Sequence, residues 1–468
     1  MRKWLPLFAA CLGTFMLLID VTIVNVALPD IAADLHTGLS GLQWVVDGYA
    51  LALAALLLVL GSLADRLGAK RVYLVGLAVF TLASLACGLA ESAAVLIAAR
   101  AVQGIGGAAM FATTLSLLHA TYTGRARGVA FGVWGAVSGA AAGVGVVLGG
   151  VLTEALSWRW IFLVNLPIAL LTIGLTVVVF APSQRRADRA VDVPGMLAFA
   201  IAATALTYGV IRGGEQGWFE GLAVVALILG ATSIAAFGWI ESRCATPMFP
   251  LTLLHNRDFC ATLLSAFGQT FAAFASTPLI SLWLQQQLDL SPLHAGLALL
   301  PMSATAFLVA GIFGRLLDDV GARWTIGVGL AAVGVGTGLL TVVDAGSSWV
   351  ALIPGLVVIG AGIGVNAPAL VSVGMAAVSP QQGGTAAGAV NTARQLGLAL
   401  GVAVLGTVFR SVAGSEGSMT LSRFADGLDA AFTVAAAVGI ALGLIAFTLF
   451  HRAPTLRAPE QSEQSAAV

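Results

Sequence analysis

Long runs of apolar residues, separated by short polar connections, occupy almost the whole chain. About 14 of these runs are long enough to cross a bilayer, because a helix of about 20 residues spans its hydrocarbon core. The pattern therefore predicts an all-α polytopic membrane protein with about 14 transmembrane helices. The expected spans cover residues 5–28, 44–64, 72–90, 95–118, 128–153, 161–181, 195–213, 221–240, 260–284, 295–317, 324–343, 350–374, 384–410 and 428–450.

The composition indicates a chain that lies almost entirely in the membrane. Of the 468 residues, 59% are hydrophobic and 9% are charged, whereas soluble domains carry about 25% charged residues. The formal net charge is zero, so nothing suggests a nucleic-acid partner. The four cysteines are scattered and form neither a metal-binding spacing nor a disulfide framework.

The basic residues predict the orientation. If the spans alternate from a cytoplasmic N-terminus, most of the 22 lysines and arginines fall on the cytoplasmic side. This bias follows the positive-inside rule and predicts a multi-pass protein of the cytoplasmic membrane with both termini in the cytoplasm. The outer side receives only Arg159, Arg212, Arg410 and Arg423, while Arg100 and Arg394 fall within spans.

A short motif occurs twice and predicts two structural halves. Residues 61–71 follow the second span and residues 314–323 follow the tenth, and both carry Gly, then Asp four residues later, then Gly three residues after that. A parallel repeat of this kind relates two halves by an axis along the membrane normal. We therefore expect a six-helix half in 1–181, linker helices 7 and 8 with their cytoplasmic connections in 182–258, a second six-helix half in 259–450 and a cytoplasmic tail in 451–468.

Asp20 lies inside the first span, about 12 Å from its outer end. An ionised and unpaired carboxylate at this depth costs several kcal/mol, so Asp20 must be paired, exposed to water or protonated. Arg100 and Gln103 fall at similar depths in the fourth span, which makes Arg100 the expected partner. A carboxylate poised between these states suits a proton-coupled transporter, in which substrate or proton competes for Asp20. A permanent structural ion pair is the alternative.

Three further residues are candidates by position. Asp47, near the outer start of the second span, is a second titrating group, a carboxylate of the outer vestibule or a solvated acid at the interface. Trp44 faces either a drug cavity or the aromatic belt of the membrane interface. Arg394 lies about 15 Å into the thirteenth span, which holds no acid. Its partner is a carbonyl group, water or an anionic substrate group, or Arg394 holds helices together.

Five segments together resemble one family over nearly the whole chain. They are Asp20-Val-Thr-Ile-Val-Asn25-Val-Ala-Leu-Pro29 in the first span, residues 61–71, residues 100–107, residues 158–167, and residues 384–406 with Asn391, Arg394 and Gln395. On these segments the chain resembles the 14-helix drug:proton antiporter branch of the major facilitator superfamily. Each segment alone is a weak signal, but their combination is specific.

The resemblance implies a secondary active transporter, not an enzyme, that exports amphiphilic organic compounds in exchange for protons by alternating access. The proton gradient would supply the energy, with no cofactor. The implied partners are a small amphiphilic substrate, protons and the lipid bilayer, with no nucleic acid, and the implied functional unit is a monomer. No Walker pattern is present, which excludes an ATP-driven pump.

The resemblance also assigns roles to residues. It favours proton coupling for Asp20 and Arg100, and implies a conformational latch at the cytoplasmic side. The substrate cavity would then include Asn25, Trp44, Gln103, Asn391, Arg394 and Gln395. The latch residues would be Gly61, Asp65, Arg66, Gly68 and Arg71, with Asp318 and Arg323 as a weaker copy.

One departure concerns the fifth span. The antiporter motif there reads Gly-Pro-x-x-Gly-Gly, whereas this chain has Gly145-Val146-Val-Leu-Gly149-Gly150. Because proline would kink the helix, its loss changes the expected bend. Gly145, Gly149 and Gly150 remain, and small residues of this kind allow close helix packing.

The substrate stays open. Asp20 is the one clear acid deep in the spans, so we expect neutral or monovalent cationic compounds. A dedicated exporter of one endogenous antibiotic or metabolite would have the same sequence pattern. A proton-coupled importer is a more distant alternative.

Overall fold

The computed structural model describes residues 2–181, 192–247, 249–313, 321–344, 346–376, 383–414 and 420–450. These residues form helices and no strand. The first part contains α1 (Leu5–Leu35), α2 (Leu39–Leu67), α3 (Ala69–Gly88), α4 (Ala93–Thr121), α5 (Gly124–Ala155), α6 (Trp160–Leu163), α7 (Asn165–Val179), α8 (Val193–Gln216) and α9 (Gly221–Arg243). The second part contains α10 (Arg257–Gln269), α11 (Thr277–Leu282), α12 (Pro292–Phe313), α13 (Gly329–Gly338), α14 (Ile353–Ala376), α15 (Gly383–Ala413) and α16 (Leu421–Leu449).

The predicted class of an all-α polytopic membrane protein is confirmed. Within the described residues, 13 helical stretches are long and apolar enough to cross a membrane. The fifth predicted span is the continuous helix α5, whose described apolar stretch, Gly143–Ala155, is shorter. Each expected apolar run therefore corresponds to a helix or to a series of consecutive helical segments.

The first helix is longer than the apolar run that predicts it. The run ends at Leu28, whereas α1 continues through Pro29 to Leu35. Polar contacts hold this extension, because Oδ2 of Asp34 accepts hydrogen bonds from Nη1 of Arg159 at 2.6 Å and from Nε1 of Trp158 at 3.0 Å. Hydrophobicity alone cannot predict a helix end that is fixed by side-chain contacts.

Three other predicted spans are interrupted within the described residues. The eleventh contains a π-helical turn at Arg323–Val328 before α13 and a 3-10 turn at Leu339–Val342 after it. The sixth divides into α6 and α7 at Val164, three residues before Pro167, whose ring lacks an N–H and clashes with the preceding turn. The ninth contains π-helical turns at Thr270–Phe274 and Trp283–Gln287, on either side of α11. Such turns interrupt the regular hydrogen-bond ladder and are frequent at functional positions.

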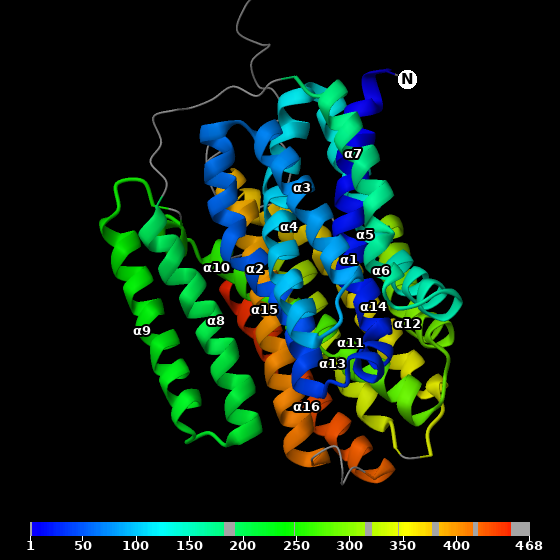
Figure 1. Cartoon of the computed structure of the whole chain (residues 1–468). Coiled ribbons are helices and arrows are strands. Elements are labelled where there is room, and N and C mark those ends of the chain that lie inside the picture. Colours follow the sequence, from blue (N-terminus) through cyan, green and yellow to red (C-terminus); the bar gives the residue numbers. More distant parts are fainter. Residues whose placement is uncertain are drawn as a thin grey trace, which may run out of the picture.

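The helices pack as a bundle with a hairpin at its side (Figure 1). We call the end where α1 begins the near end and the end where α1 finishes the far end. The helix α1 packs on α5, α7 and α11, while two further contacts, α2 with α15 and α5 with α12, join the first group of helices to the second. The α8–α9 hairpin lies beside the bundle, with α8 against both α2 and α15.

Candidate functional site

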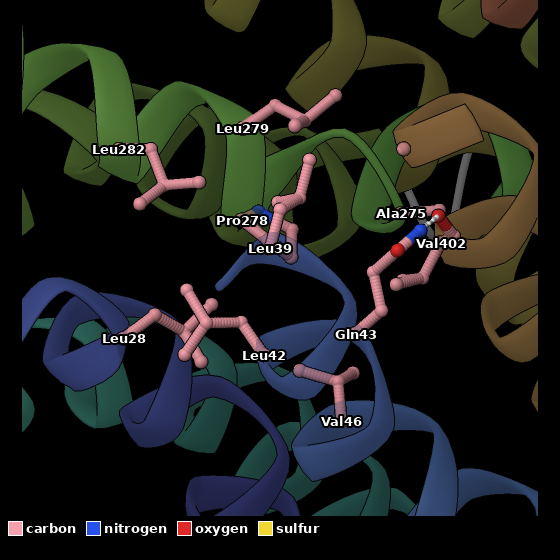
Figure 2. Close-up of a pocket in the computed structure, with 11 residues that line it drawn as sticks. Leu28, Leu39, Leu42, Gln43, Val46, Ala275, Pro278, Leu279, Leu282 and Val402 are labelled. Atoms are coloured by element: carbon pink, nitrogen blue, oxygen red, sulfur yellow. Dashed lines mark hydrogen bonds between the residues drawn. The ribbon is translucent and has the colours of Figure 1, made fainter. Parts of the chain in front are cut away.

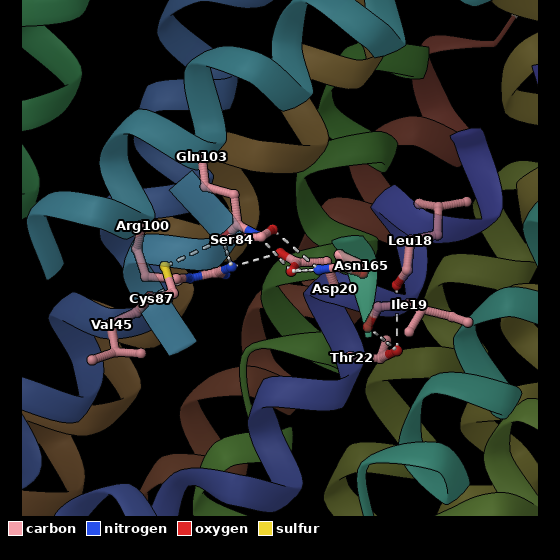
Figure 3. Close-up of polar contacts among 10 residues, drawn as sticks. All are labelled: Leu18, Ile19, Asp20, Thr22, Val45, Ser84, Cys87, Arg100, Gln103 and Asn165. Atoms are coloured by element: carbon pink, nitrogen blue, oxygen red, sulfur yellow. Dashed lines mark hydrogen bonds and ion pairs between the residues drawn. The ribbon is translucent and has the colours of Figure 1, made fainter. Parts of the chain in front are cut away.

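A buried polar network surrounds the carboxylate of Asp20 on α1 (Figure 3). Nη1 of Arg100 on α4 lies 2.5 Å from Oδ2 of Asp20. Oδ1 accepts hydrogen bonds from the side-chain amides of Gln103, at 2.8 Å, and Asn165, at 3.0 Å. Asp20 is 0% exposed and the three donors are at most 1% exposed. The pair expected from equal depth is thus present, and this conformation seals it from water.

The guanidinium of Arg100 is held from several directions. Its Nε donates to the carbonyl oxygen of Val45 on α2 at 3.1 Å, and Nη1 also donates to Oε1 of Gln103 at 2.6 Å. The group stacks over the ring of Tyr49, 4.3 Å from its centre. The contacts of the charge pair therefore involve α1, α2 and α4, so a movement of any of these helices changes the distance between the two charges or their hydrogen bonds.

Asn165 and Ser84 belong to this network. Asn165 lies in the 158–167 segment that carries the resemblance, but sequence reasoning gave it no role, and it missed Ser84. The hydroxyl oxygen of Ser84 accepts hydrogen bonds from Gln103 at 2.8 Å and from Asn165 at 3.3 Å. Asn165 is the first residue of α7, directly after the break that precedes Pro167. The sequence did offer one signal for Asn165, which is a polar amide two residues before a proline inside an apolar run.

Asp47 on α2 is buried without a partner. The residue is 0% exposed, and neither carboxylate oxygen has a hydrogen bond within the described residues. This burial does not fit a solvated interfacial acid, one of the alternatives that the sequence left open. An ionised carboxylate in such surroundings costs several kcal/mol, so the neutral, protonated side chain is the favoured form in this conformation.

At the far end, α2 meets α15 in a closed seam (Figure 2). Nε2 of Gln43 donates to the carbonyl oxygen of Val402 at 3.0 Å, and Oε1 of Gln43 accepts from Nη2 of Arg410 at 2.9 Å. Gly406 allows this approach, because a Cβ there would collide with the Gln43 amide. Asp47 lies one helical turn from Gln43 and therefore on the same face of α2. A small apolar pocket beside the seam is lined by Leu28, Leu39, Leu42, Val46, Ala275, Pro278, Leu279 and Leu282.

A second far-end seam joins α5 to α12 through glycines. A Cβ on Gly150 would lie 2.6 Å from Cα of Leu293, and a Cβ on Gly296 would lie 2.7 Å from the carbonyl oxygen of Val146. The residue that replaces the expected proline thus presents its backbone to α12. Gly145 and Gly149 face α1 instead, and a Cβ at Gly149 would lie 2.8 Å from the carbonyl oxygen of Ile23.

The predicted cavity residues of α15 lie in the second group of helices. Arg394, Gln395 and Asn391 are each partly exposed. The guanidinium of Arg394 forms no hydrogen bond or ion pair with any residue that the structure describes, and its Nε is buried. Oε1 of Gln395 is likewise buried and has no partner among these residues. Asn391 does have a polar partner.

The remaining predicted cavity residues lie away from α15. Oδ1 of Asn25 on α1 is buried and has no hydrogen-bond partner in the part of the chain that the structure describes. Trp44 packs on Tyr208 of α8, with ring centres 6.2 Å apart, and so contacts the peripheral hairpin.

The proposed latch is described only in part. Gly68, with a φ of 95°, makes the tight turn between α2 and α3, and a Cβ on Gly61 would lie 3.8 Å from Ala112. Arg66 and Arg71 are exposed. The guanidinium of Arg323 lies over the ring of Phe447, 3.9 Å from its centre. The side chain of Asp65 and the whole of Asp318 lie outside the described residues.

The bundle, its broken helices and its buried central charge pair define a multi-pass membrane transporter. Residues 10–255 and 260–467 match the Major Facilitator Superfamily, and the chain belongs to this family. It is therefore a transporter and not an enzyme.

Several curated relatives are similar along most of the chain. The multidrug resistance protein Stp of Mycobacterium tuberculosis (strain CDC 1551 / Oshkosh) is 38% identical over 86% of this chain and 75% of its own length. The puromycin resistance protein pur8 of Streptomyces alboniger is 35% identical over 96% of this chain and 90% of its own. The methylenomycin A resistance protein of Streptomyces coelicolor (strain ATCC BAA-471 / A3(2) / M145) is 36% identical over 90% of this chain and 88% of its own length.

A solved structure of a peptide transporter, POT, in complex with sulfate has the same fold. Its TM-score is 0.69 at 14% identity, over 95% of this chain and 94% of that one. At this identity the likeness supports the fold alone.

Proposed function

We propose that this protein exports amphiphilic organic compounds, drugs or antibiotics among them, across the cytoplasmic membrane in exchange for protons. The observation that carries the proposal is the sealed Asp20–Arg100 pair, with Gln103 and Asn165 as further donors to the carboxylate. A carboxylate whose hydrogen-bond donors lie on other helices changes its surroundings when those helices move, which is how proton binding is coupled to a conformational change. The resistance proteins to which the chain is similar support efflux as the direction of transport.

The closed far-end seams suggest one stage of an alternating-access cycle. With α2 joined to α15 and α5 joined to α12, substrate would enter from the near end. The bias of the basic residues supports a cytoplasmic near end with both termini on that side. Opening of the far end would then admit protons to Asp20 and Asp47, release the substrate outside, and be followed by proton release to the cytoplasm. We expect a monomer to complete this cycle.

The proposal has two versions, a multidrug exporter and a dedicated exporter of one compound, which differ in the range of substrates. One relative is named for multidrug resistance, and two are named for resistance to a single compound. A chemically diverse panel of amphiphiles, tested under one gradient, separates a multidrug exporter from a dedicated exporter of one antibiotic or metabolite. The direction of gradient-driven flux separates both from an importer.

The test uses the purified full chain in proteoliposomes with an acidic lumen. Wild type should accumulate a fluorescent amphiphile from the panel, and a protonophore should abolish that accumulation. Asp20→Asn should be inactive, while Glu91→Gln, which removes an exposed carboxylate outside the spans, should match wild type. Transport by wild type that ignores the gradient, or full gradient-driven activity of Asp20→Asn, would overturn the proposal.

A further inference from the structure

We propose that Arg394 binds an oxyanion of the transported compound, such as a carboxylate or sulfonate, so that the protein prefers anionic over cationic amphiphiles. This inference rests on the proposed function and names the class of substrate. It departs from the neutral or monovalent cationic compounds that the sequence led us to expect.

The first observation is a cation without a partner at membrane depth. Arg394 lies 11 residues after Gly383, about 16 Å along α15. Its guanidinium has no hydrogen bond, ion pair or ring contact with a described residue, and its Nε is buried. Arginine keeps its charge in proteins, and a bare guanidinium inside a membrane span is costly. An anionic group of a bound substrate would supply the counter-charge that no described residue provides.

The second observation is that the protein fixes the base of this side chain. The hydroxyl of Thr270, the first residue of the π-helical turn Thr270–Phe274, donates to the carbonyl oxygen of Arg394 at 2.6 Å. Gly397, one turn further along α15, lies so close to Phe267 that a Cβ would collide with its carbonyl oxygen. These contacts with α10 and the π-helical turn hold the backbone that carries Arg394, which reduces the entropic cost of binding.

The third observation is a set of unused amides beside the arginine in sequence and packing. Oε1 of Gln395, the next residue on α15, is buried and has no hydrogen-bond partner among the described residues. The same holds in this part of the chain for Oε1 of Gln269, which directly precedes Thr270 and is 3% exposed. Buried amides without partners cost free energy, so they are expected to bond a polar group that is present during function. They suit hydroxyl or amide groups next to the oxyanion.

The fourth observation concerns the opposite charge. Asp20 is enclosed by three donors and 0% exposed, and Asp47 is 0% exposed in the far-end seam. Neither carboxylate can contact a bound cation in this conformation. Two further acids of the described spans are partly exposed, but Asp30 lies in the last two turns of α1 and Asp429 in the first three turns of α16. Arg394 lies in the interior of α15, so the partly exposed charge at that depth is positive. An oxyanion is stabilised there, because charge-assisted hydrogen bonds to guanidinium are strong in a medium of low dielectric constant.

The test compares two probes that differ only in charge, dansylglycine and dansylglycinamide, by equilibrium binding to purified full-length protein in detergent. Wild type should bind the carboxylate about tenfold more tightly than the amide. Arg394→Gln should lose this preference while its affinity for the amide stays unchanged, and Arg394→Lys should keep part of it. Arg423→Gln, which removes an exposed arginine at the start of α16, should behave as wild type.

Thermal unfolding of the same variants separates binding from helix packing. Removal of an unpartnered cation should leave Arg394→Gln as stable as wild type or more stable. A fall in stability together with equal weakening of both probes would assign Arg394 to helix packing and overturn the proposal. Equal affinity of wild type for the two probes, or binding of neither at millimolar concentration, would overturn it as well.

The headgroup of an anionic lipid is the other source of an oxyanion, and a second experiment tests whether such a lipid occupies the site. Binding is repeated in nanodiscs with and without an anionic phospholipid. If that lipid displaces dansylglycine from wild type, the site belongs to a headgroup and the substrate proposal fails. Since no proton gradient is used, these outcomes are distinct from a failure of gradient-driven transport, which would overturn the proposed function alone.

Discussion

Nδ2 of Asn165 lies 3.0 Å from Oδ1 of Asp20, although 145 positions separate the two residues along the chain. The contact places the first residue of α7 against the central acid of α1. It also shows why a helix break at this point matters, because the break sets the start of α7 beside the carboxylate. Asn165 thereby becomes a candidate for controlling how the carboxylate of Asp20 takes part in transport.

Removal of this donor should slow gradient-driven transport. Asn165→Ala leaves Oδ1 of Asp20 with Gln103 as its remaining amide donor, and loss of a buried hydrogen bond to a charged group should lower the initial rate by about tenfold. Initial transport rates at matched protein levels measure the loss. Thr232→Ala, on an exposed face of α9, is the control. An unchanged rate in Asn165→Ala would contradict the expected role.

The Asp20–Arg100 pair should show strong coupling in stability. Asp20→Asn leaves the buried guanidinium without its counter-charge, and breaking a buried pair in this way costs about 3–5 kcal/mol. The double variant Asp20→Asn/Arg100→Gln removes both charges and should recover most of that loss. Unfolding of the single and double variants in detergent gives the interaction energy as a double-mutant cycle. Additive losses would mean that the two charges do not stabilise each other.

Substitution of Asp47 should have the opposite effect on stability to substitution of Asp20. Because the carboxylate of Asp47 has no hydrogen-bond partner among the described residues, Asp47→Asn should not lower the stability and should remove a proton-binding group from the α2 face that forms the far-end seam. The two arginines that bond this part of α2 already have counter-charges. Arg410, which bonds Gln43, pairs with Glu215 at 3.1 Å, and Arg100, which bonds Val45, pairs with Asp20. In wild type, a higher pH should ionise Asp47 and favour an open far end, whereas Asp47→Asn should abolish this dependence.

The accessibility of a single cysteine measures this effect. Val46→Cys, placed in the pocket beside the seam, is introduced into a chain from which the four native cysteines have been replaced. Its reaction with a water-soluble thiol reagent should become faster as the pH rises in the Asp47 protein, and should be independent of pH in the Asp47→Asn protein. The same pH dependence in both proteins would assign the effect to another group.

The number and type of elements could be predicted from the sequence, because membrane helices are long, apolar and separated by short connections. The depth of Asp20 and Arg100 also predicted their pairing, since both positions follow from helical rise along known spans. These are local properties, or simple consequences of a bilayer of fixed thickness. The exact ends were less predictable, since the extension of α1 to Leu35 depends on contacts with Trp158 and Arg159.

The arrangement around the site depends on contacts between distant parts of the chain, which one sequence does not reveal. Gln43 and Val402 are separated by 359 positions, and nothing in either apolar run indicates that they meet. The isolation of Arg394 was equally hidden, because several partners were compatible with its position in a span. Burial of Asp47 was also beyond prediction, since residues near a helix end are either exposed or covered according to the packing of neighbouring helices.

The glycine at position 150 should control closure of the far end. A Cβ there would lie 2.6 Å from Cα of Leu293 and 2.7 Å from the carbonyl oxygen of Pro292, so Gly150→Ala must separate α5 from α12. Overpacking of this kind costs about 1–3 kcal/mol in the closed conformation and should shift the population towards an open far end. Spin labels at the far ends of α5 and α12 should report a larger share of long distances. Gly174→Ala on α7, where a Cβ meets no atom within 4 Å, is the matched control and should leave the distances unchanged. If the two variants give the same distribution as wild type, the α5–α12 contact tolerates the extra methyl group and does not control the seam.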